Sequence, residues 1–193
     1  ISTSPDPTTA PTVSPVDAAA TSLVGRWAHF DVVAYQGAAM KTLIASFGFN
    51  DITEVDGRLV DTASFCFAEQ RTDQPIETSL SDAATQAITP PPTPLMLDIV
   101  DGRVRLRRPA SPTPIGIELD DPSVDSLPDD PSGARLVDAD LDGKPGITVT
   151  ITVGGGLTGE LYLARREIFA WEAYLVDADT DRKSTRLNSS HIP

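Results

Sequence analysis

The sequence predicts a mostly β domain, an antiparallel barrel or sandwich with one short helix, truncated at its C-terminal end. Three observations carry this prediction. Several segments alternate apolar and polar residues with the period of a strand, most regularly over residues 147–153 (ITVTITV). Asp-Gly pairs at 56–57 and 101–102 are preferred hairpin turns. Clusters of Gly and Pro separate the alternating segments, as expected for consecutive short strands.

The N-terminal segment, residues 1–22, differs in composition from the rest of the chain. It is rich in Pro, Thr, Ser and Ala and lacks the apolar side chains that offset ordering entropy. We therefore expect a disordered linker at 1–22 and a β domain over 23–180. Because such linkers join membrane anchors to folded domains, a lipid anchor upstream of Ile1 is a further expectation.

The first part of the domain predicts three strands. Residues 25–35 are enriched in aromatic and β-branched residues, and residues 43–50 have the period of a strand, with apolar side chains at 43, 45, 47 and 49. After the Asp56–Gly57 turn, apolar residues recur on one face over 59–67. These segments should pair as consecutive antiparallel strands.

A short helix and a hairpin come next along the chain. Ser79 and Ser81 are candidate N-caps for one or two helical turns over 79–89, which Pro90 to Pro92 would stop. Residues 95–107 predict a hairpin around Asp101-Gly102. Pairing outward from that turn sets opposite each other Ile99 and Val104, Asp98 and Arg105, and Leu97 and Leu106.

The C-terminal half predicts one long loop and three strands. Residues 109–137, rich in Pro and Asp, read as an irregular loop with a short strand around 115–119. Strands are expected over 147–153, 160–165 and 168–176. The glycines at 154–156 have no following Gly-Lys-Ser/Thr, so they predict a turn and no phosphate-binding loop.

The last residues are expected to be an artefactual tail, 181–193. Residues 181–191 (DRKSTRLNSSH) resemble the translation of a common sequencing adapter, as found in metagenomic reads. Such a tail would mean that the natural chain continues beyond residue 180. It would also leave 168–176 as an unpaired apolar edge.

Composition excludes several functions. The net charge of −13 makes the protein acidic and disfavours contact with a phosphate backbone, so we expect no nucleic-acid partner. The sequence has no apolar run long enough for a transmembrane span. One cysteine, Cys66, and two histidines cannot form an intrachain disulfide or a Cys/His zinc site.

The stretch DADLDGKPG at 138–146, here called the Asp loop, is the segment that carries recognisable chemistry. Asp138, Asp140 and Asp142 stand at alternate positions, so a tight loop can point all three carboxylates inward. Gly143 permits a sharp bend, and the backbone carbonyl of Lys144 could add another oxygen. Hard cations such as Ca²⁺ prefer this kind of donor set. The predicted metal ligands are Asp138, Asp140, Asp142 and Lys144, and the expected role of the ion is structural.

The Asp loop is nevertheless no EF-hand. The twelfth position counted from Asp138 is Val149, where an EF-hand needs a bidentate Glu, and the flanks predict strands. The repulsion among crowded carboxylates is the physical argument for a metal, because it is costly without a counter-ion. Missing ligands could come from nearby acids, namely Glu118, Asp120, Asp121, Asp125, Asp129 and Asp130. The alternative is a solvated acidic loop that is screened by salt.

Two segments of the chain resemble known groups of proteins. Residues 23–27 (LVGRW) resemble the Gly-x-Trp opening strand of lipocalin-like barrels, in which the tryptophan plugs one end. The layout of 20–176 is similar to that of bacterial secreted or lipid-anchored β-rich proteins with an Asp-x-Asp-x-Asp-Gly-x-Pro-Gly loop and a Gly-Glu-x-Tyr strand, here at 159–162. That similarity implies the bacterial cell envelope or the extracellular space. It implies no activity, and Leu141 departs from the glycine common before the last Asp of such loops.

Three functions are left open by the sequence. The first is a non-enzymatic envelope or secreted protein with a structural calcium loop. The second is a lipocalin-like carrier of a small apolar ligand, with a cavity lined by residues such as Trp27, Phe47 and Phe65. The third is a secreted hydrolase that uses paired carboxylates. We assign no catalytic residue, because His29 lies among aromatic residues on a predicted strand and reads as structural.

Overall fold

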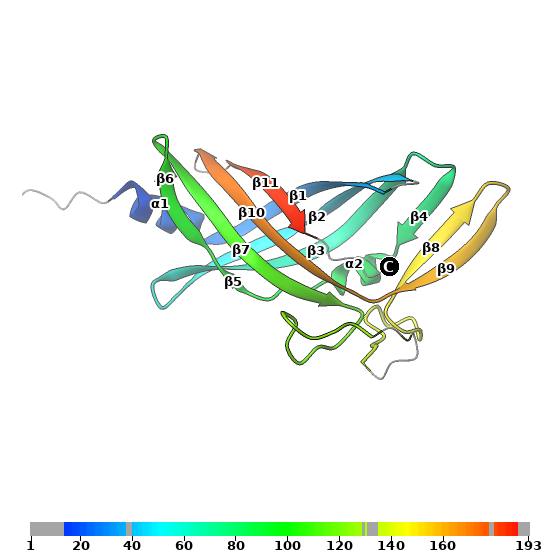
Figure 1. Ribbon diagram of the computed structural model, residues 1–193. Helices are drawn as coiled ribbons and strands as arrows, with labels where there is room; N and C mark the ends of the chain where they lie inside the picture. The colour runs from blue at the N-terminus through cyan, green and yellow to red at the C-terminus, as the bar shows by residue number, and fades with distance from the viewer. Residues whose placement is uncertain (1–13, 38–39, 129, 131–134, 178–179, 189–193) are drawn as a thin grey trace, which may run out of the picture.

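The computed structural model describes residues 14–37, 40–128, 130, 135–177 and 180–188. In these residues, eleven strands form antiparallel sheets and two short helices accompany them. This confirms the predicted mostly β, antiparallel fold. The described strands form a sandwich-like arrangement and do not close into a barrel. The long strands run side by side, and the β8–β9 hairpin projects at one end (Figure 1).

The first sheet has the order β1-β2-β3-β5. Its hairpin turn at Asp56 and Gly57 has φ values of 51° and 73°, the left-handed conformation that Asp-Gly turns favour. The pairing is regular along β1 and β2, and a register shift interrupts the β2–β3 pairing after Phe47. The strands are β1 (Gly25–Gln36), β2 (Lys41–Val55), β3 (Arg58–Thr72) and β5 (Thr93–Pro94).

The second sheet has the order β11-β10-β7-β6. Its β6–β7 hairpin has the predicted register, with Ile99 opposite Val104, Asp98 opposite Arg105 and Leu97 opposite Leu106. Asp101 and Gly102 adopt positive φ, as that turn requires. The strands are β6 (Met96–Val100), β7 (Arg103–Ile115), β10 (Arg165–Asp177) and β11 (Thr180–Asn188).

The third sheet has the order β4-β8-β9 and carries the Asp loop at its base. The alternating ITVTITV segment forms its central strand, as predicted. The strands are β4 (Ile76–Leu80), β8 (Ile147–Val153) and β9 (Leu157–Leu163).

The structure corrects the expected linker and helix count. Helix α1 (Pro15–Leu23) covers residues 15–22 of the predicted disordered linker and the first residue of the predicted β domain, while 1–13 lies outside the described residues. The Ser14 side chain caps it by accepting from the Asp17 backbone N–H, and Pro15 occupies the first turn. Leu23 is 1 % exposed, so its burial against the core stabilises a helix that the local composition does not predict. The predicted helix is α2 (Asp82–Gln86), capped by Ser81.

Two further expectations differ from the structure. The predicted loop from 109 onward begins later, because β7 continues to Ile115. Pro112 and Pro114 fit the strand because the β6 ladder pairs only with Arg103–Arg107, so beyond that point β7 has, within the described residues, a ladder partner on the β10 side alone and prolines are tolerated at its other edge. Residues 168–176 are not an unpaired edge, since β10 pairs with β7 on one side and β11 on the other. The strand β11 covers most of the segment expected to be an artefactual tail.

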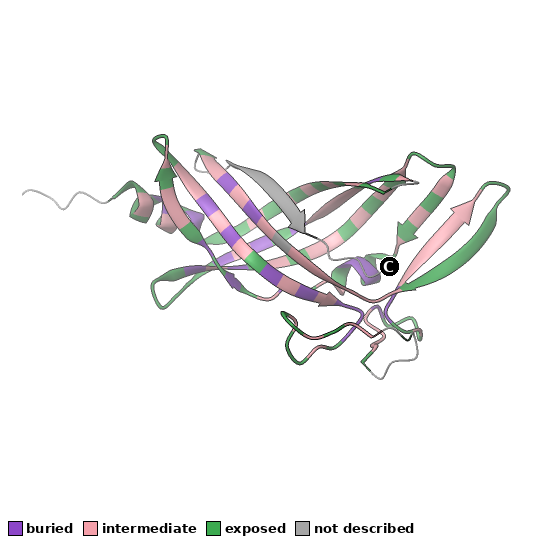
Figure 2. Cartoon of the chain, in the orientation of Figure 1, coloured by how far each residue is buried: buried purple, intermediate pink, exposed green. Residues whose placement is uncertain are grey.

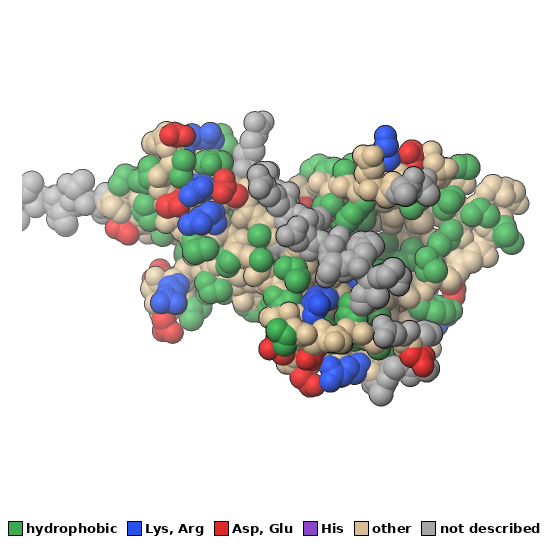
Figure 3. Space-filling model, in the orientation of Figure 1, with side chains coloured by type: hydrophobic (Ala, Val, Ile, Leu, Met, Phe, Trp, Pro, Cys, Tyr) green, Lys and Arg blue, Asp and Glu red, His purple; other side chains and the backbone are tan. Residues whose placement is uncertain are grey.

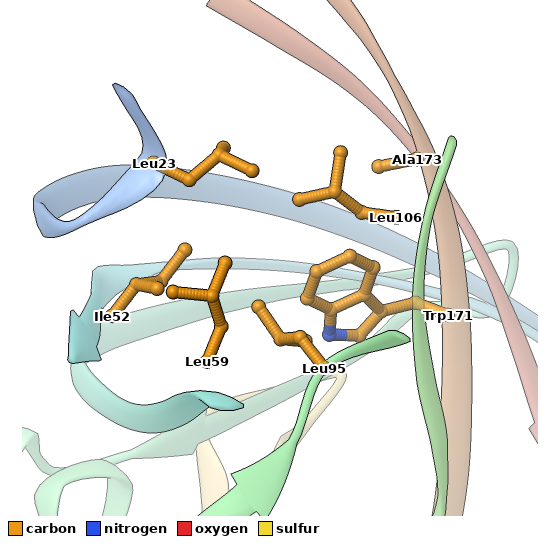
Figure 4. Packing of buried hydrophobic residues seen from close by; sticks show 7 residues of the cluster. All are labelled: Leu23, Ile52, Leu59, Leu95, Leu106, Trp171 and Ala173. Carbon is orange, nitrogen blue, oxygen red and sulfur yellow. The ribbon is translucent and has the colours of Figure 1, made fainter. Parts of the chain in front are cut away.

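The main core lies at the end of the molecule where α1 meets the two large sheets (Figures 2 and 4). Its seven buried residues come from α1, β2, β3, the segment before β6, β7 and β10, so they join the two sheets. Trp27 packs against this cluster and donates its Nε1–H to the Leu23 carbonyl at 2.8 Å, which fixes the end of α1 on β1. The cluster is Leu23, Ile52, Leu59, Leu95, Leu106, Trp171 and Ala173.

A second, smaller core positions the Asp loop. Ala84 of α2, Ile115 at the end of β7 and Ile147 at the start of β8 are buried together. Ala139 of the Asp loop packs against this cluster. The apolar side chain between the first two aspartates therefore anchors the loop to the body of the protein.

The two large sheets differ on their outer faces. Phe30, Phe47 and Phe67 stack across β1, β2 and β3, with ring centroids 4.8 and 4.4 Å apart, and the outer two are 60 % and 39 % exposed. Over the β6–β7 hairpin, by contrast, charged side chains of both signs lie close together (Figure 3). Arg105 there pairs with Asp98 of β6 and Glu172 of β10. Within the described residues, no helix is both long enough and apolar enough to cross a bilayer.

Candidate metal site

The Asp loop is the last part of the long connection between β7 and β8. Two isolated β-bridges hold this connection together, one between Ile117 and Leu136 and one between Asp138 and Gly146. Backbone hydrogen bonds from Gly146 N to the Val137 carbonyl (2.7 Å) and from Ala139 N to the Gly146 carbonyl (3.0 Å) tie the loop's two ends together. The loop is thus held as a compact ring at the foot of β8.

Two glycines allow the ring to sit against its neighbours. Gly116 and Gly146 both have positive φ, at 66° and 85°. A Cβ atom on Gly146 would lie 2.6 Å from the Leu163 carbonyl oxygen at the end of β9, and one on Gly116 would lie 2.7 Å from the Gly146 Cα. Only glycine fits at such contacts. The Pro-Gly turn of the sequence therefore has a packing role that local pattern alone does not show.

The first aspartate organises the loop backbone. Asp138 accepts hydrogen bonds from the backbone N–H of Asp142 (Oδ1, 3.0 Å) and of Gly143 (Oδ2, 2.8 Å). Leu141, just before them, has a φ of 60° and is 87 % exposed. Such a conformation is strained for leucine, and the surrounding hydrogen bonds hold it in place.

The second aspartate is the most buried of the three. Asp140 is 8 % exposed, and its Oδ2 accepts the backbone N–H of Thr148 on β8 at 3.0 Å. Its Oδ1 is buried and receives no hydrogen bond from the described residues. Burying a carboxylate oxygen without a donor is unfavourable, so this atom is suited to accept a positive partner.

The third aspartate links the loop to the same strand. Asp142 accepts from the Lys144 backbone N–H (Oδ1, 2.9 Å) and from the Thr148 hydroxyl (Oδ2, 2.6 Å). Thr148 therefore contacts both Asp140 and Asp142. No local sequence pattern points to Thr148, because its role depends on β8 passing directly beside the loop.

The three aspartates converge as the sequence predicts. One oxygen of each lies within 4.8 Å of those of the other two, and among the described residues this is the cluster suited to hold a metal ion. An oxygen-only set of this kind suits Ca²⁺ or another hard divalent cation. The carbonyl of Lys144 as a fourth ligand stays a prediction.

The Lys144 side chain forms an ion pair with a fourth carboxylate, that of Glu160. Its Nζ lies 2.6 Å from Glu160 Oε2 on β9 and 3.8 Å from Asp142 Oδ2. The Tyr162 hydroxyl donates to the same Glu160 oxygen at 3.0 Å. The hydrogen bond from Lys144 is the main cause that lowers the pKa of Glu160, and the same bond raises the pKa of Lys144. Glu160 is not among the acids that the sequence nominates.

Three of the acids that the sequence nominates as extra ligands, Asp120, Asp121 and Asp125, have partners outside the Asp loop. Arg135 binds Asp120 and Asp125, each at 2.9 Å. The backbone N–H of Asp121 is the first cause that lowers the pKa of Asp125, followed by Arg135. Asp121 accepts from the backbone N–H of Ser123. Asp129 lies outside the described residues.

The side chains expected to line a carrier cavity are dispersed. Trp27 packs on the main core, Phe47 stacks between Phe30 and Phe67, and Phe65 lies against His29 at 5.2 Å. The His29 side chain hydrogen-bonds Asn50 at 2.9 Å, in keeping with a structural role. A hollow of about 800 Å³ between β3, β4 and β8 has one carboxylate in its lining, Glu77, and does not include the Asp loop.

No protein-family model, no curated protein and no solved structure matches the chain.

Proposed function

We propose that this chain is a non-enzymatic protein of the bacterial envelope or the extracellular space, and that its Asp loop binds Ca²⁺ as a structural ion. The ion would hold the long connection between β7 and β8 against the β8–β9 hairpin. The observation that supports this is Asp140, which is 8 % exposed and keeps Oδ1 without a described donor inside a three-carboxylate cluster. A divalent cation at that place would supply the missing positive partner.

The ligand set supports a modest affinity. With one oxygen from each of the three carboxylates and one predicted carbonyl, the loop provides fewer oxygens than the six to eight that Ca²⁺ takes, and water would complete the shell. Extracellular calcium modules with such sites bind at about 10⁻⁴–10⁻³ M. That range is useful where calcium is at millimolar concentration, which favours a location outside the cytoplasm.

The direct test is calorimetric titration with CaCl₂ of the wild type and of Asp140→Asn. The wild type should bind one ion with a Kd of about 10⁻⁴–10⁻³ M. Asp140→Asn keeps the shape and the acceptor for Thr148 but removes the charge, and binding should weaken at least about tenfold.

The matched control is Asp120→Asn, which removes the same charge from an 89 % exposed side chain that pairs with Arg135. It should leave calcium binding almost unchanged. The proposal is wrong if the wild type binds no calcium at 10 mM, roughly ten times the upper Kd expected, or if both variants bind like the wild type.

A further inference from the structure

The side chain of Lys144 stands between two sets of carboxylates. On one side lies the Asp loop, with Asp142 Oδ2 at 3.8 Å from Nζ, and on the other lies Glu160 Oε2 at 2.6 Å. Lys144 and Glu160 are 35 % and 40 % exposed, so both can move without disturbing the core. In this arrangement an ammonium group supplies the positive charge beside the cluster.

Strand geometry puts Glu160 on the face of the hairpin that meets the loop. Thr148 is opposite Tyr162 and Thr150 is opposite Glu160 in the β8–β9 ladder. Directly opposed residues share a face, and so do alternate residues of one strand. Because Thr148 binds Asp142 and Asp140, the face that carries Thr148 is the one turned toward the Asp loop.

We propose that Glu160 is a further ligand of the ion site and that the Lys144 side chain is its built-in competitor. In the ion-free protein the ammonium holds Glu160 beside Asp142. An arriving divalent cation displaces Nζ, and the freed carboxylate then adds its oxygens from β9 to those of the Asp loop. This inference rests on the proposed function and names the residues that regulate that site.

Charge and coordination number support the exchange. A divalent ion attracts the surrounding carboxylates about twice as strongly as a monovalent ammonium at the same distance. A glutamate from outside the loop would also replace the bidentate acid that is missing at Val149, the position where an EF-hand has it. The Lys144 backbone carbonyl is unaffected by which way the side chain points.

Calorimetric titration with CaCl₂ tests this with three variants of the full chain. Lys144→Met removes the competitor but keeps the backbone carbonyl, and calcium should bind about two- to fivefold tighter, the factor expected for loss of one exposed ion pair. Glu160→Gln should bind at least about tenfold more weakly. Glu160→Asp keeps the charge but shortens the reach, and it should also bind more weakly.

The third variant separates ligation from a general charge effect. If Glu160 acts only through its field, Glu160→Asp will bind like the wild type, and the inference is overturned. It is equally overturned if Lys144→Met leaves the Kd unchanged. Arg71→Met and Glu69→Gln, which break a remote exposed pair at 3.5 Å, serve as controls and should not change the Kd.

The outcomes also distinguish the two proposals. Wild-type binding that is insensitive to Lys144 and Glu160 but lost in Asp140→Asn would leave the proposed function standing and remove this inference. Binding by Lys144→Met alone would support the competitor role and contradict calcium binding by the native chain. If no protein in the series binds calcium, both proposals are wrong.

Discussion

Asp61 and Arg108 form an ion pair inside the protein, with both side chains fully buried. Asp61 Oδ2 lies 3.2 Å from Arg108 Nε, and Asp61 Oδ1 accepts from Asn50 at 2.6 Å. Arg108 also donates to Ser111 and to the Pro91 carbonyl. Burial lowers the pKa of Arg108, and Asp61 opposes that change. The pair links β3 of the first sheet to β7 of the second.

We expect Asp61→Ala to destabilise the protein by about 3–5 kcal/mol, because it leaves a guanidinium buried without its counter-ion. Urea denaturation measures the change. The double variant Asp61→Ala/Arg108→Met should lose less than the sum of the two single changes, because they share one interaction. Glu69→Ala, in the exposed pair with Arg71, should lie within about 0.5 kcal/mol of the wild type. A loss below about 1 kcal/mol for Asp61→Ala would contradict the account.

Residue-level prediction from sequence succeeded where the chemistry is local. The alternate spacing of Asp138, Asp140 and Asp142 was enough to predict their convergence, since a short loop brings alternate side chains together. Glu160 and Thr148 were not predictable in the same way. Their place depends on how the β8–β9 hairpin docks against the loop, which no local pattern encodes.

At the scale of elements, the Asp loop depends on the close approach of Gly146 to β9. Gly146→Ala should destabilise the protein by more than the roughly 1–3 kcal/mol of a strained positive φ, because its Cβ would also meet the Leu163 carbonyl at 2.6 Å. Gly155→Ala is the matched control, with a similar φ of 88° and nothing within 4 Å of the added Cβ. Chemical denaturation compares the two.

Both variants introduce the same backbone strain, so the difference between their losses of stability measures the cost of the contact between the added Cβ and Leu163. Equal losses would show that the ring at the foot of β8 does not need its tight contact with β9. A larger loss for Gly146→Ala is the expected outcome.

Elements were predicted best where a turn fixes the register. The β6–β7 hairpin was correct to the residue pair because Asp101-Gly102 specifies a two-residue turn. Helix α1 was not predicted because it is held mainly by Leu23. The core that buries Leu23 is formed by strands distant in the sequence. The extension of β7 to Ile115 was missed because prolines disfavour strands unless the neighbouring ladder accommodates them.

At the scale of the whole molecule, exposed ion pairs make stability depend on pH. Hydrogen bonds from Arg26 and Arg105 lower the pKa values of Asp51 and Asp98, and backbone N–H groups with Arg135 lower that of Asp125. A carboxyl whose pKa falls on folding stabilises the native state above its ordinary pKa of about 3.9. That stabilisation is lost as the pH falls through the lowered pKa.

The thermal midpoint should therefore fall as the pH is lowered from about 5 to about 3. Asp125→Asn removes one of the linked groups, so its midpoint should fall less steeply over that interval. Differential scanning calorimetry at a series of pH values measures both profiles. Profiles of equal slope would show that Asp125 carries no such linkage.

Some properties of the whole molecule could be predicted from the sequence and others could not. Composition and alternation predicted a β-rich acidic protein, because both depend on averages along the chain. The division into separate sheets, and the contrast between the phenylalanine stack outside β1–β3 and the charged face over β6–β7, required the register of every strand.

Thermal unfolding with calcium and with chelator tests the central claim most directly, because a structural ion must stabilise the native state. At 10 mM CaCl₂, about 10–100 times the expected Kd, the wild-type midpoint should lie roughly 3–10 °C above that in chelator. In chelator, Asp140→Asn should be no less stable than the wild type, since it removes a buried unpaired charge, and calcium should raise its midpoint by clearly less than it raises that of the wild type. Equal wild-type midpoints with calcium and with chelator would contradict the account.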